Sequence, residues 1–301
     1  MKSGFVSILG RPNAGKSTLL NQLIGAKIAI VANKPQTTRT SIQGVLTLPD
    51  AQIVFLDTPG IHKADSLIGK RMMATVRAAL DQRDLLLLVV DVSRKFGMED
   101  RQAVDLIRKA DTPALLVLNK TDLLHKDKGT LLPLIEQYRA LNEFADYIPL
   151  SARSGEGLPE LRQAIVARLP EGPAYFPPDF ITDQPDRFLA AELIREKILD
   201  VTREEVPHSV AVAVDAWEDT PDLIRIYATT YVERAGQKGI IIGAGGAMLK
   251  QIGTRARQEM ERLFGRHVYL SLHVKVKANW REQPGFLAGL DWRTMAGADE
   301  N

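Results

Sequence analysis

The sequence has 301 residues, of which 45% are hydrophobic and 25% charged, and its formal net charge is +2. These values are typical of a globular protein with one large or two ordinary domains. It contains no cysteine, which excludes disulfides, thiolate metal sites and a cysteine nucleophile. The longest apolar run, Leu85 to Val90, is far shorter than the roughly 18 residues that a membrane span needs. The first predicted strand leaves no room for a signal peptide, so we expect a cytoplasmic protein.

Alternating strand and helix patterns fill the first part of the sequence. Helical patterns separate most of the apolar, strand-like runs, which is typical of an α/β domain with a mostly parallel sheet. The strand-like runs are 5–9, 53–56, 85–90, 114–118 and 147–150, and the helical patterns are 16–24, 66–80, 100–109, 130–141 and 157–168. In such a domain the ligand is expected at the carboxyl ends of the strands.

The segment directly after the first strand is Gly-Arg-Pro-Asn-Ala-Gly-Lys-Ser, which fits the phosphate-binding pattern G-x-x-x-x-G-K-[ST]. It lies where a strand turns into a helix, the context that this loop requires. Lys16 is expected to reach the β- and γ-phosphates, and the Ser17 hydroxyl to ligate Mg²⁺. The predicted nucleotide-binding residues here are Gly10, Arg11, Pro12, Asn13, Ala14, Gly15, Lys16, Ser17 and Thr18.

A second motif, Asp-Thr-Pro-Gly, follows the strand at 53–56. Its acid can hold Mg²⁺ through water, and its glycine lets a backbone N–H approach the γ-phosphate. The residues that this motif adds to the nucleotide site are Asp57, Thr58, Pro59, Gly60 and Ile61.

The polar segment 34–40 is predicted to be a loop whose threonine hydroxyls close onto Mg²⁺. Thr38 is the predicted ligand and Thr37 the alternative. The predicted magnesium ligands are therefore Ser17, Thr38 and Asp57. The predicted catalytic residues are Lys16, Thr38 and Gly60.

Guanine is the base that the next two motifs predict. Asn119-Lys120-Thr121-Asp122 follows the strand at 114–118, and Ser151-Ala152 follows the strand at 147–150. Asp122 can accept hydrogen bonds from N1–H and the 2-amino group of guanine, whereas adenine would leave that carboxylate unpaired. Asn119 can brace the loop, and the Lys120 stem can lie along the base. Small residues at Ser151 and Ala152 let a backbone N–H reach the guanine O6.

This ordered set of motifs resembles the translation-factor-type P-loop GTPases over about the first 170 residues. The resemblance implies a GTP-hydrolysing switch. In many such GTPases a glutamine after the D-x-x-G motif orients the attacking water, but Ile61 stands there in this sequence. The sequence thus resembles a subgroup with a hydrophobic residue at that position, and slow intrinsic hydrolysis is expected. Asn13 matches a residue that helps related GTPases to bind K⁺, so the resemblance also implies K⁺ as a cofactor.

A proline-rich connector and a second domain follow. Five prolines lie between Leu169 and Pro185, a density that blocks both helices and central strands. We therefore predict a GTPase domain over 1–169, a linker over 170–185, and a second domain with a C-terminal tail over 186–301. The second domain is predicted to have a helix at 186–200, strands at 210–214 and 223–232, a short helix near 238–242, a helix at 247–264 and a strand at 268–276.

The second domain is strongly basic around a glycine-rich loop. Residues 234–281 contain ten lysines and arginines against two acids, a local charge of +8. Gly243-Ala244-Gly245-Gly246 fits the GxxG loop of a KH domain, which clamps about four single-stranded nucleotides. The element order is similar to the type II KH arrangement. The predicted RNA-binding residues are Lys238, Gly243, Ala244, Gly245, Gly246 and Lys250.

A GTPase domain and a KH domain joined by one proline-rich linker resemble a bacterial GTPase family that acts in assembly of the small (30S) ribosomal subunit. The resemblance implies GTP and GDP as ligands, the 3′ region of 16S rRNA as partner, a role in 16S rRNA maturation, a monomeric state and peripheral contact with the inner membrane. Two alternatives stay open at this point: a P-loop ATPase or kinase, and a KH adaptor whose nucleotide domain binds GTP with little turnover.

Overall fold

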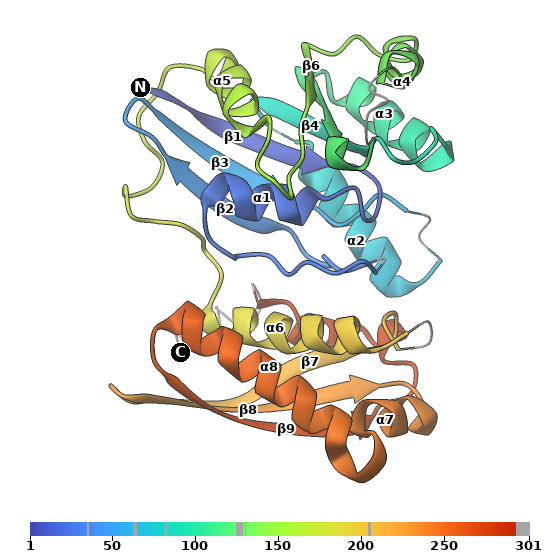
Figure 1. Ribbon diagram of the computed structural model, residues 1–301, viewed down its shortest axis with the longest axis vertical. Coiled ribbons are helices and arrows are strands. Elements are labelled where there is room, and N and C mark those ends of the chain that lie inside the picture. The colour runs from blue at the N-terminus through green and yellow to red at the C-terminus, as the bar shows by residue number, and fades with distance from the viewer. Residues whose placement is uncertain are drawn as a thin grey trace. The chain divides into compact units, whose positions relative to one another are not determined.

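Figure 1 shows a computed structural model that describes residues 1–34, 36–62, 65–81, 83–124, 129, 131–203 and 206–292. Contacts divide the chain into two compact units. Unit 1 comprises Met1–Ala29, Thr38–Ala64 and Gly69–Asp183, and unit 2 comprises Ile30–Thr37, Asp65–Ile68 and Gln184–Asn301. The last boundary falls inside the proline-rich segment that the sequence predicts as a linker.

Unit 1 is built on a six-stranded sheet with the order β2-β3-β1-β4-β5-β6 (Figure 1). The strands are β1 (Lys2–Leu9), β2 (Ile42–Thr47), β3 (Ala51–Asp57), β4 (Leu85–Asp91), β5 (Ala114–Asn119) and β6 (Asp146–Pro149). All neighbouring strands are parallel except β2, which runs antiparallel to β3. The prediction of a mostly parallel sheet is therefore confirmed.

Helices cover both faces of this sheet, and each face has its own hydrophobic core. The first core joins the sheet to α1 (Lys16–Ile24) and α5 (Leu158–Arg168). The second joins the opposite face to α2 (Leu67–Ala78), α3 (Met98–Ala110) and α4 (Leu131–Arg139). Strands buried on both sides are apolar throughout, which explains why Leu-Leu-Leu-Leu-Val-Val in β4 contains no polar residue.

The sequence did not predict strand β2. Its sequence, Ile-Gln-Gly-Val-Leu-Thr, mixes polar residues and a glycine with apolar ones, so the apolar pattern is weak. An edge strand has one neighbour in the sheet, and a weak pattern is sufficient there because the strand is only partly buried. Gly44 packs closely under α1, since a Cβ there would lie 2.6 Å from the Ile28 Cδ1 atom and that side chain would have to shift.

Unit 2 contains a three-stranded sheet with helices on one face (Figure 1). Its core elements follow the predicted order of helix, two strands, two helices and strand. They are α6 (Asp186–Val201), β7 (Ala211–Asp219), β8 (Leu223–Val232), α7 (Ala235–Ile242), α8 (Ala247–Phe264) and β9 (His267–Val276). β7 pairs antiparallel with β8, and β8 pairs parallel with β9.

Two short C-terminal helices were not predicted: the 3-10 helix η4 (Trp280–Glu282) and α9 (Pro284–Gly289). Trp280 at the start of η4 is fully buried, and its indole N–H donates to the Ser209 carbonyl at 2.9 Å. A six-residue helix offers too little sequence to show a periodic pattern.

A segment distant in sequence completes unit 2. Ile30 is 3% exposed and belongs to the same core as α6 and α8. The Val31 N–H donates to the Glu196 Oε1 atom at 2.8 Å. The Thr37 carbonyl accepts a hydrogen bond from the guanidinium of Arg195, which is 2% exposed. Two buried charged residues of α6 thus hold both ends of residues 31–37.

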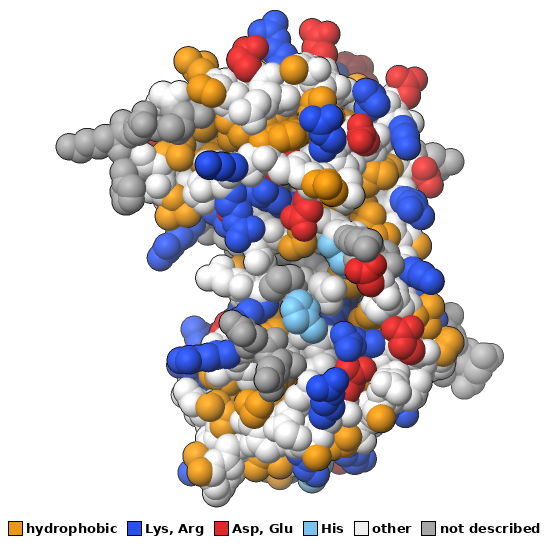
Figure 2. All heavy atoms as spheres, turned by 90° about the vertical axis from the view of Figure 1, so that its right-hand side faces the viewer, with side chains coloured by type: hydrophobic (Ala, Val, Ile, Leu, Met, Phe, Trp, Pro, Cys, Tyr) orange, Lys and Arg blue, Asp and Glu red, His pale blue; other side chains and the backbone are white. Residues whose placement is uncertain are grey.

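No helix among the described residues is long and apolar enough to cross a membrane. Figure 2 shows acidic and basic side chains interspersed over the face in view.

Candidate nucleotide site and RNA-binding loop

The phosphate loop joins β1 to α1, and two of its glycines are required by space. Gly10 has φ +147°, and a Cβ there would lie 2.3 Å from the Val89 carbonyl oxygen. Gly15 has φ +97° and lies against the Asn119 side chain. The α1 backbone N–H groups begin directly after Gly15, which makes this turn suited to a phosphate group.

Lys16 is 6% exposed, and its Nζ donates to the carbonyl oxygens of Gly10 and Arg11, each at 3.1 Å. Burial lowers the pKa of Lys16 to about 8, and the nearby Asp57 carboxylate opposes that change. The loop carbonyls thus hold the ammonium group inside the turn that phosphates would enter.

The three predicted magnesium ligands lie together, Ser17 in the first turn of α1, Asp57 at the end of β3 and Thr38 in the loop before β2. The Ser17 hydroxyl donates to the Asp57 Oδ2 atom at 2.6 Å, and the Ser17 and Thr38 hydroxyl oxygens are 2.9 Å apart. The Thr37 hydroxyl instead donates to the Lys34 carbonyl at 2.6 Å. The geometry therefore favours Thr38 over Thr37.

Asp57 is fully buried, and burial raises its pKa to about 6, against the opposing charge of Lys16. Its Oδ1 atom is buried and has no hydrogen-bond partner among the described residues. An orphaned carboxylate oxygen beside two hydroxyls is a donor set of the hard-oxygen type that Mg²⁺ prefers. The residues present therefore fit a magnesium ion.

Asn119 connects three loops that are far apart in sequence. Its Nδ2 group donates to the Ala14 carbonyl at 2.8 Å, and its Oδ1 atom accepts from the N–H groups of Lys120 at 2.8 Å and Ala152 at 2.9 Å. Asn119 is 2% exposed, so these bonds are shielded from water. The side chain thereby fixes the phosphate loop and both predicted base-binding loops relative to one another.

The sequence did not single out Asp91, which the structure places in the site. The Lys120 Nζ donates to the Asp91 Oδ2 atom and to the Asn13 carbonyl, each at 2.7 Å. Burial acts to raise the pKa of Asp91, but hydrogen bonds from Lys120 and Ser93 outweigh it and lower that pKa. Asp91 ends β4 and pairs in register with Asn119, so its position at the end of an apolar strand was the available signal.

Asp122 is exposed, and its Oδ1 atom accepts a hydrogen bond from the Ser151 hydroxyl at 2.7 Å. Ser151 itself is fully buried, two residues after the end of β6. The buried hydroxyl thus orients the carboxylate that the sequence assigns to guanine. Ala152 lies next to it, with its N–H already bonded to Asn119.

Other predicted residues have structural contacts of their own. The Arg11 guanidinium forms a buried ion pair with Asp100 of α3 at 2.9 Å. The backbone of Arg11 is therefore the part of this residue that can take part in phosphate binding. A Cβ on Gly60 would lie 2.7 Å from the Pro12 backbone. Ile61 is 1% exposed in the core below α2 and α3, and its N–H donates to the Gly10 carbonyl at 3.1 Å. Its side chain therefore cannot orient a water molecule.

The GxxG loop lies between α7 and α8, where the sequence places it. Gly243, Gly245 and Gly246 all have positive φ values, of 71°, 57° and 81°. A Cβ on Gly243 would lie 2.7 Å from the Met248 Cβ atom, whereas Gly245 and Gly246 face open space. Ala244 and Gly245 are exposed. The loop backbone and the start of α8 are therefore open to an approaching phosphate group.

Lys238 and Lys250 flank this loop on α7 and α8, half-buried and exposed respectively. Other cations of the basic stretch are committed elsewhere: Arg266 pairs with Asp219 at 2.5 Å and Arg281 with Glu233 at 2.7 Å. The positive charge available to a polyanion is thus smaller than the sequence count of +8 indicates.

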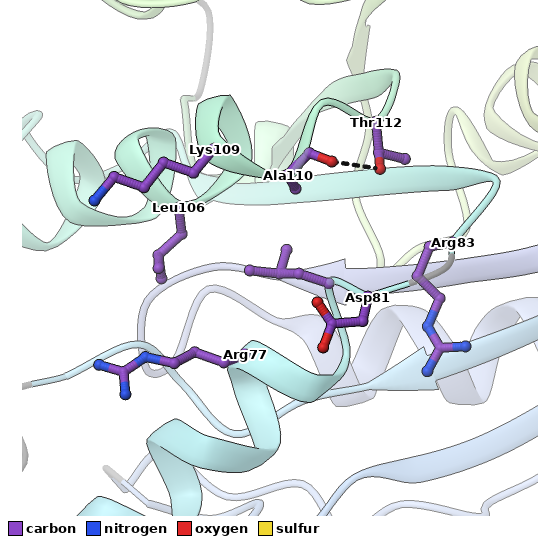
Figure 3. A pocket seen from close by; sticks show the side chains of 8 residues that line it. Arg77, Asp81, Arg83, Leu106, Lys109, Ala110 and Thr112 are labelled. Atoms are coloured by element: carbon purple, nitrogen blue, oxygen red, sulfur yellow. Dashed lines mark hydrogen bonds between the residues drawn. The ribbon is translucent and has the colours of Figure 1, made fainter.

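A pocket of about 620 Å³ lies elsewhere in unit 1 (Figure 3). Asp81 and Arg83 of its lining precede β4, and Ala110 and Thr112 precede β5. It therefore lies at the amino ends of these parallel strands, opposite the edge where the nucleotide motifs gather. The pocket contributes no residue to the predicted nucleotide site.

Comparisons with known proteins agree with this geometry. The family model described as "50S ribosome-binding GTPase" matches residues 5–120, and the KH domain model matches residues 205–281. A protein from Syntrophus aciditrophicus, GTPase Era, is 49% identical over 95% of this chain and 94% of its own length. GTPase Era from Staphylococcus epidermidis is 48% identical over 95% of both chains.

Two solved structures are similar over nearly the whole chain, each with a TM-score of 0.93, 41% identity, and coverage of 97% of this chain and 99% of the other. One is a tyrosine-to-alanine variant of Aquifex aeolicus Era bound to GDP·AlF4⁻. The other is Era in complex with MgGDPNP and nucleotides 1506–1542 of 16S ribosomal RNA. With both domains matched and close to half of the residues identical to named relatives, this chain belongs to the Era family of GTPases.

Proposed function

We propose that this chain binds Mg²⁺–GTP at the carboxyl edge of the unit 1 sheet and single-stranded rRNA at the GxxG loop of unit 2. The observation that carries the nucleotide assignment is the convergence of Ser17, Thr38 and Asp57, in which the Ser17 hydroxyl lies within 3 Å of both the Thr38 hydroxyl and the Asp57 carboxylate. The 16S rRNA in the complex of a similar protein supports the RNA assignment.

In this proposal each motif has one task. The Lys16 ammonium would leave the loop carbonyls and neutralise phosphate charge, and the α1 N–H groups would bind phosphate oxygens. Ser17, Thr38 and Asp57 would hold Mg²⁺, which neutralises charge that develops on the phosphates. Asp122, oriented by Ser151, would accept from the guanine edge. A base that lacks the matching donors would leave this carboxylate unpaired in the complex, which selects against adenine.

Hydrolysis is the step for which unit 1 lacks the usual water-orienting glutamine at position 61. Ile61 is buried and apolar, so the glutamine role has no counterpart at that position. K⁺ held by Asn13 is our candidate for the missing charge. Asn13 has φ +62°, and its carbonyl is fixed by Lys120 at 2.7 Å, which holds the residue in the phosphate loop. We expect slow turnover without an activator, in a cytoplasmic protein that works on the small ribosomal subunit.

The RNA assignment is tested by replacing both Ala244 and Gly245 with aspartate. Two carboxylates would face the phosphates that the loop backbone must approach, so RNA affinity should fall strongly while GTP hydrolysis without RNA stays unchanged. The double asparagine variant is the matched control, because it has the same shape without charge and asparagine tolerates the φ of +57° at Gly245.

The measurement is fluorescence anisotropy with a labelled RNA of nucleotides 1506–1542, together with a thermal melt of each variant. Binding by wild type should also weaken with salt, with log K falling about 0.7 per neutralised phosphate. A loop that grips about four nucleotides implies a log–log slope of roughly −2 to −3. If the folded aspartate variant binds this RNA as tightly as wild type, the loop is not an RNA clamp.

A further inference from the structure

The sheet of unit 2 has a second face, opposite the helices. The β8 side chains Ile224, Ile226 and Ala228 are fully buried in the core that α6 and α8 cover. The alternate residues of β8 therefore point to the other face, since successive side chains of a strand alternate. They are Arg225, Tyr227, Thr229 and Tyr231, of which Thr229 is buried and the other three are half-buried.

The register of the sheet extends this face onto both neighbours of β8. On β9 the paired residues are Tyr269, Ser271, His273 and Lys275, and on β7 they are Ala211, Ala213, Ala216 and Glu218. The β7 side thus contributes mainly alanine methyl groups, which project only a short distance from the sheet. Two aromatic rings stand beside it: Tyr227 and Tyr269, with centroids 6.0 Å apart in an edge-to-face arrangement.

Tyr269 is 50% exposed, which is unusual for a large aromatic side chain on a strand of a folded sheet. Burial of the apolar faces of such a ring would be favourable, so the exposed ring of Tyr269 is available to a planar ligand group. His273 and Lys275 on the same strand extend this face with polar and positively charged side chains, and Lys275 is exposed. The β9 half of the face therefore combines an accessible ring with positive charge.

The far end of the face shows how it accommodates a planar group. Phe286 of α9 lies against Tyr231, with ring centroids 4.9 Å apart, and the Lys277 ammonium lies 5.0 Å from the Phe286 centroid. A ring is thus held between a tyrosine and a lysine by this chain itself. At the other end of the face, Tyr227 and Tyr269 contact each other.

Among the strand residues described here, negative charge on this face lies on the β7 side. Glu218 lies 3.8 Å from Arg225, and Asp215 accepts a hydrogen bond from Thr229 at 2.7 Å. Both carboxylates thus have partners on β8. A polyanion would be steered along the β8 and β9 side, past the two tyrosines and toward Lys275.

We propose that the β8 and β9 side of this sheet face is a second RNA-binding surface, on which Tyr227 and Tyr269 stack bases of a single strand while Lys275 contacts its phosphates. The inference rests on the proposed RNA binding by this chain and extends it. The occupant is RNA rather than protein because flat aromatic surfaces with adjacent cations match bases and phosphates. A GxxG loop holds about four nucleotides. The RNA bound by a similar protein spans nucleotides 1506–1542, so most of an RNA of that length would extend beyond the loop.

The test compares long and short RNA probes on the full chain. The long probe is an RNA of nucleotides 1506–1542, and the short probes are hexanucleotides tiled across it. Replacing Tyr227 and Tyr269 together by alanine should weaken binding of the long probe about 25-fold or more, because each of the two stacked bases contributes at least about fivefold. Binding of the best hexanucleotide should change less than about twofold, since the GxxG loop is intact.

Two control variants separate stacking from folding and from general loss of aromatic surface. The double phenylalanine variant at the same positions keeps both rings and should bind the long probe like wild type. Tyr175→Ala removes a ring that is 49% exposed in unit 1 and should leave binding unchanged. Thermal melts of all variants should agree within a few degrees.

Wild-type affinity of the double alanine variant for the long probe would overturn the proposal. An equal loss for long and short probes would overturn it too, because the tyrosines would then be supporting the GxxG loop. Failure of the GxxG proposal gives a different result: the aspartate loop variant would keep its hexanucleotide binding, while the tyrosine variant would still lose affinity for the long probe.

Discussion

Asp57 is a charged group that destabilises the ligand-free protein, and its removal should make the fold more stable while abolishing magnesium-dependent activity. The side chain is fully buried, and burial raises its pKa from 3.8 to about 6 in spite of the Lys16 charge. A raised carboxyl pKa means that the folded state prefers the protonated form. This contribution to stability is complete below pH 3.8 and is lost as the pH rises through 6.

The magnitude follows from the two pKa values. The difference between pKa values of 3.8 and about 6 corresponds to a destabilisation of the folded state by about 3 kcal/mol at pH 7.5, and by about half of that at pH 5. Asp57→Asn resembles the protonated carboxyl in shape and carries no charge. The free energy of unfolding of the variant should therefore exceed that of wild type by about 3 kcal/mol at pH 7.5, with a smaller excess at pH 5.

The assay must report on unit 1 alone. All three tryptophans, at 217, 280 and 292, lie in unit 2, so their fluorescence reports the wrong unit. Hydrogen exchange of peptides from β1 and β3, measured without nucleotide and with a chelator, gives the local free energy of opening. We expect protection of these peptides to rise about 100-fold in the variant at pH 7.5. Equal or lower protection at pH 7.5 would refute the assignment of a destabilising buried charge.

Three further predictions concern the nucleotide. Lys16→Ala should remove useful GTP binding and spare RNA binding, because this ammonium is the buried cation in the phosphate loop; GTP affinity within threefold of wild type in calorimetry would contradict this. Asp122→Asn should shift preference from GTP toward XTP, since an amide can donate to the xanthine 2-carbonyl; a tenfold preference for GTP over XTP in the variant would show that Asp122 does not read the base. Hydrolysis should be faster in K⁺ than in Na⁺ at equal ionic strength, and equal rates in both salts would leave RNA or a protein partner as the activator.

The nucleotide motifs could be located from the sequence because each one follows an apolar strand. Parallel strands bring their carboxyl ends to one edge, so motifs as distant as Gly10 and Ser151 were expected to be neighbours. The fold class and the family were predicted correctly for this reason. The GxxG loop was found in the same way, because a glycine loop between two helices has a defined place in the order of elements.

Long-range partners could not be predicted, because nothing local encodes them. Arg11 belongs to the phosphate loop by pattern, yet its side chain pairs with Asp100, 89 positions away. Asp91 ends an apolar strand without a recognisable motif and holds Lys120 in place. Asn119 was expected to brace its own loop, and it also bonds the Ala14 carbonyl, 105 positions away. Such contacts depend on the packing of several elements, which a single sequence does not reveal.

The position of residues 30–37 in unit 2 limits how this protein can be dissected. A fragment that begins after the proline-rich segment would include α6 and the whole KH sheet but would lack Ile30. Loss of a buried isoleucine side chain costs about 2–5 kcal/mol, and Arg195 and Glu196 would also lose the backbone groups that they hold. RNA affinities measured on such a fragment would therefore describe a weakened fold. Residues 30–37 precede most of unit 1 in the sequence but belong to unit 2 in the structure. Biochemical work on unit 2 therefore requires the intact chain.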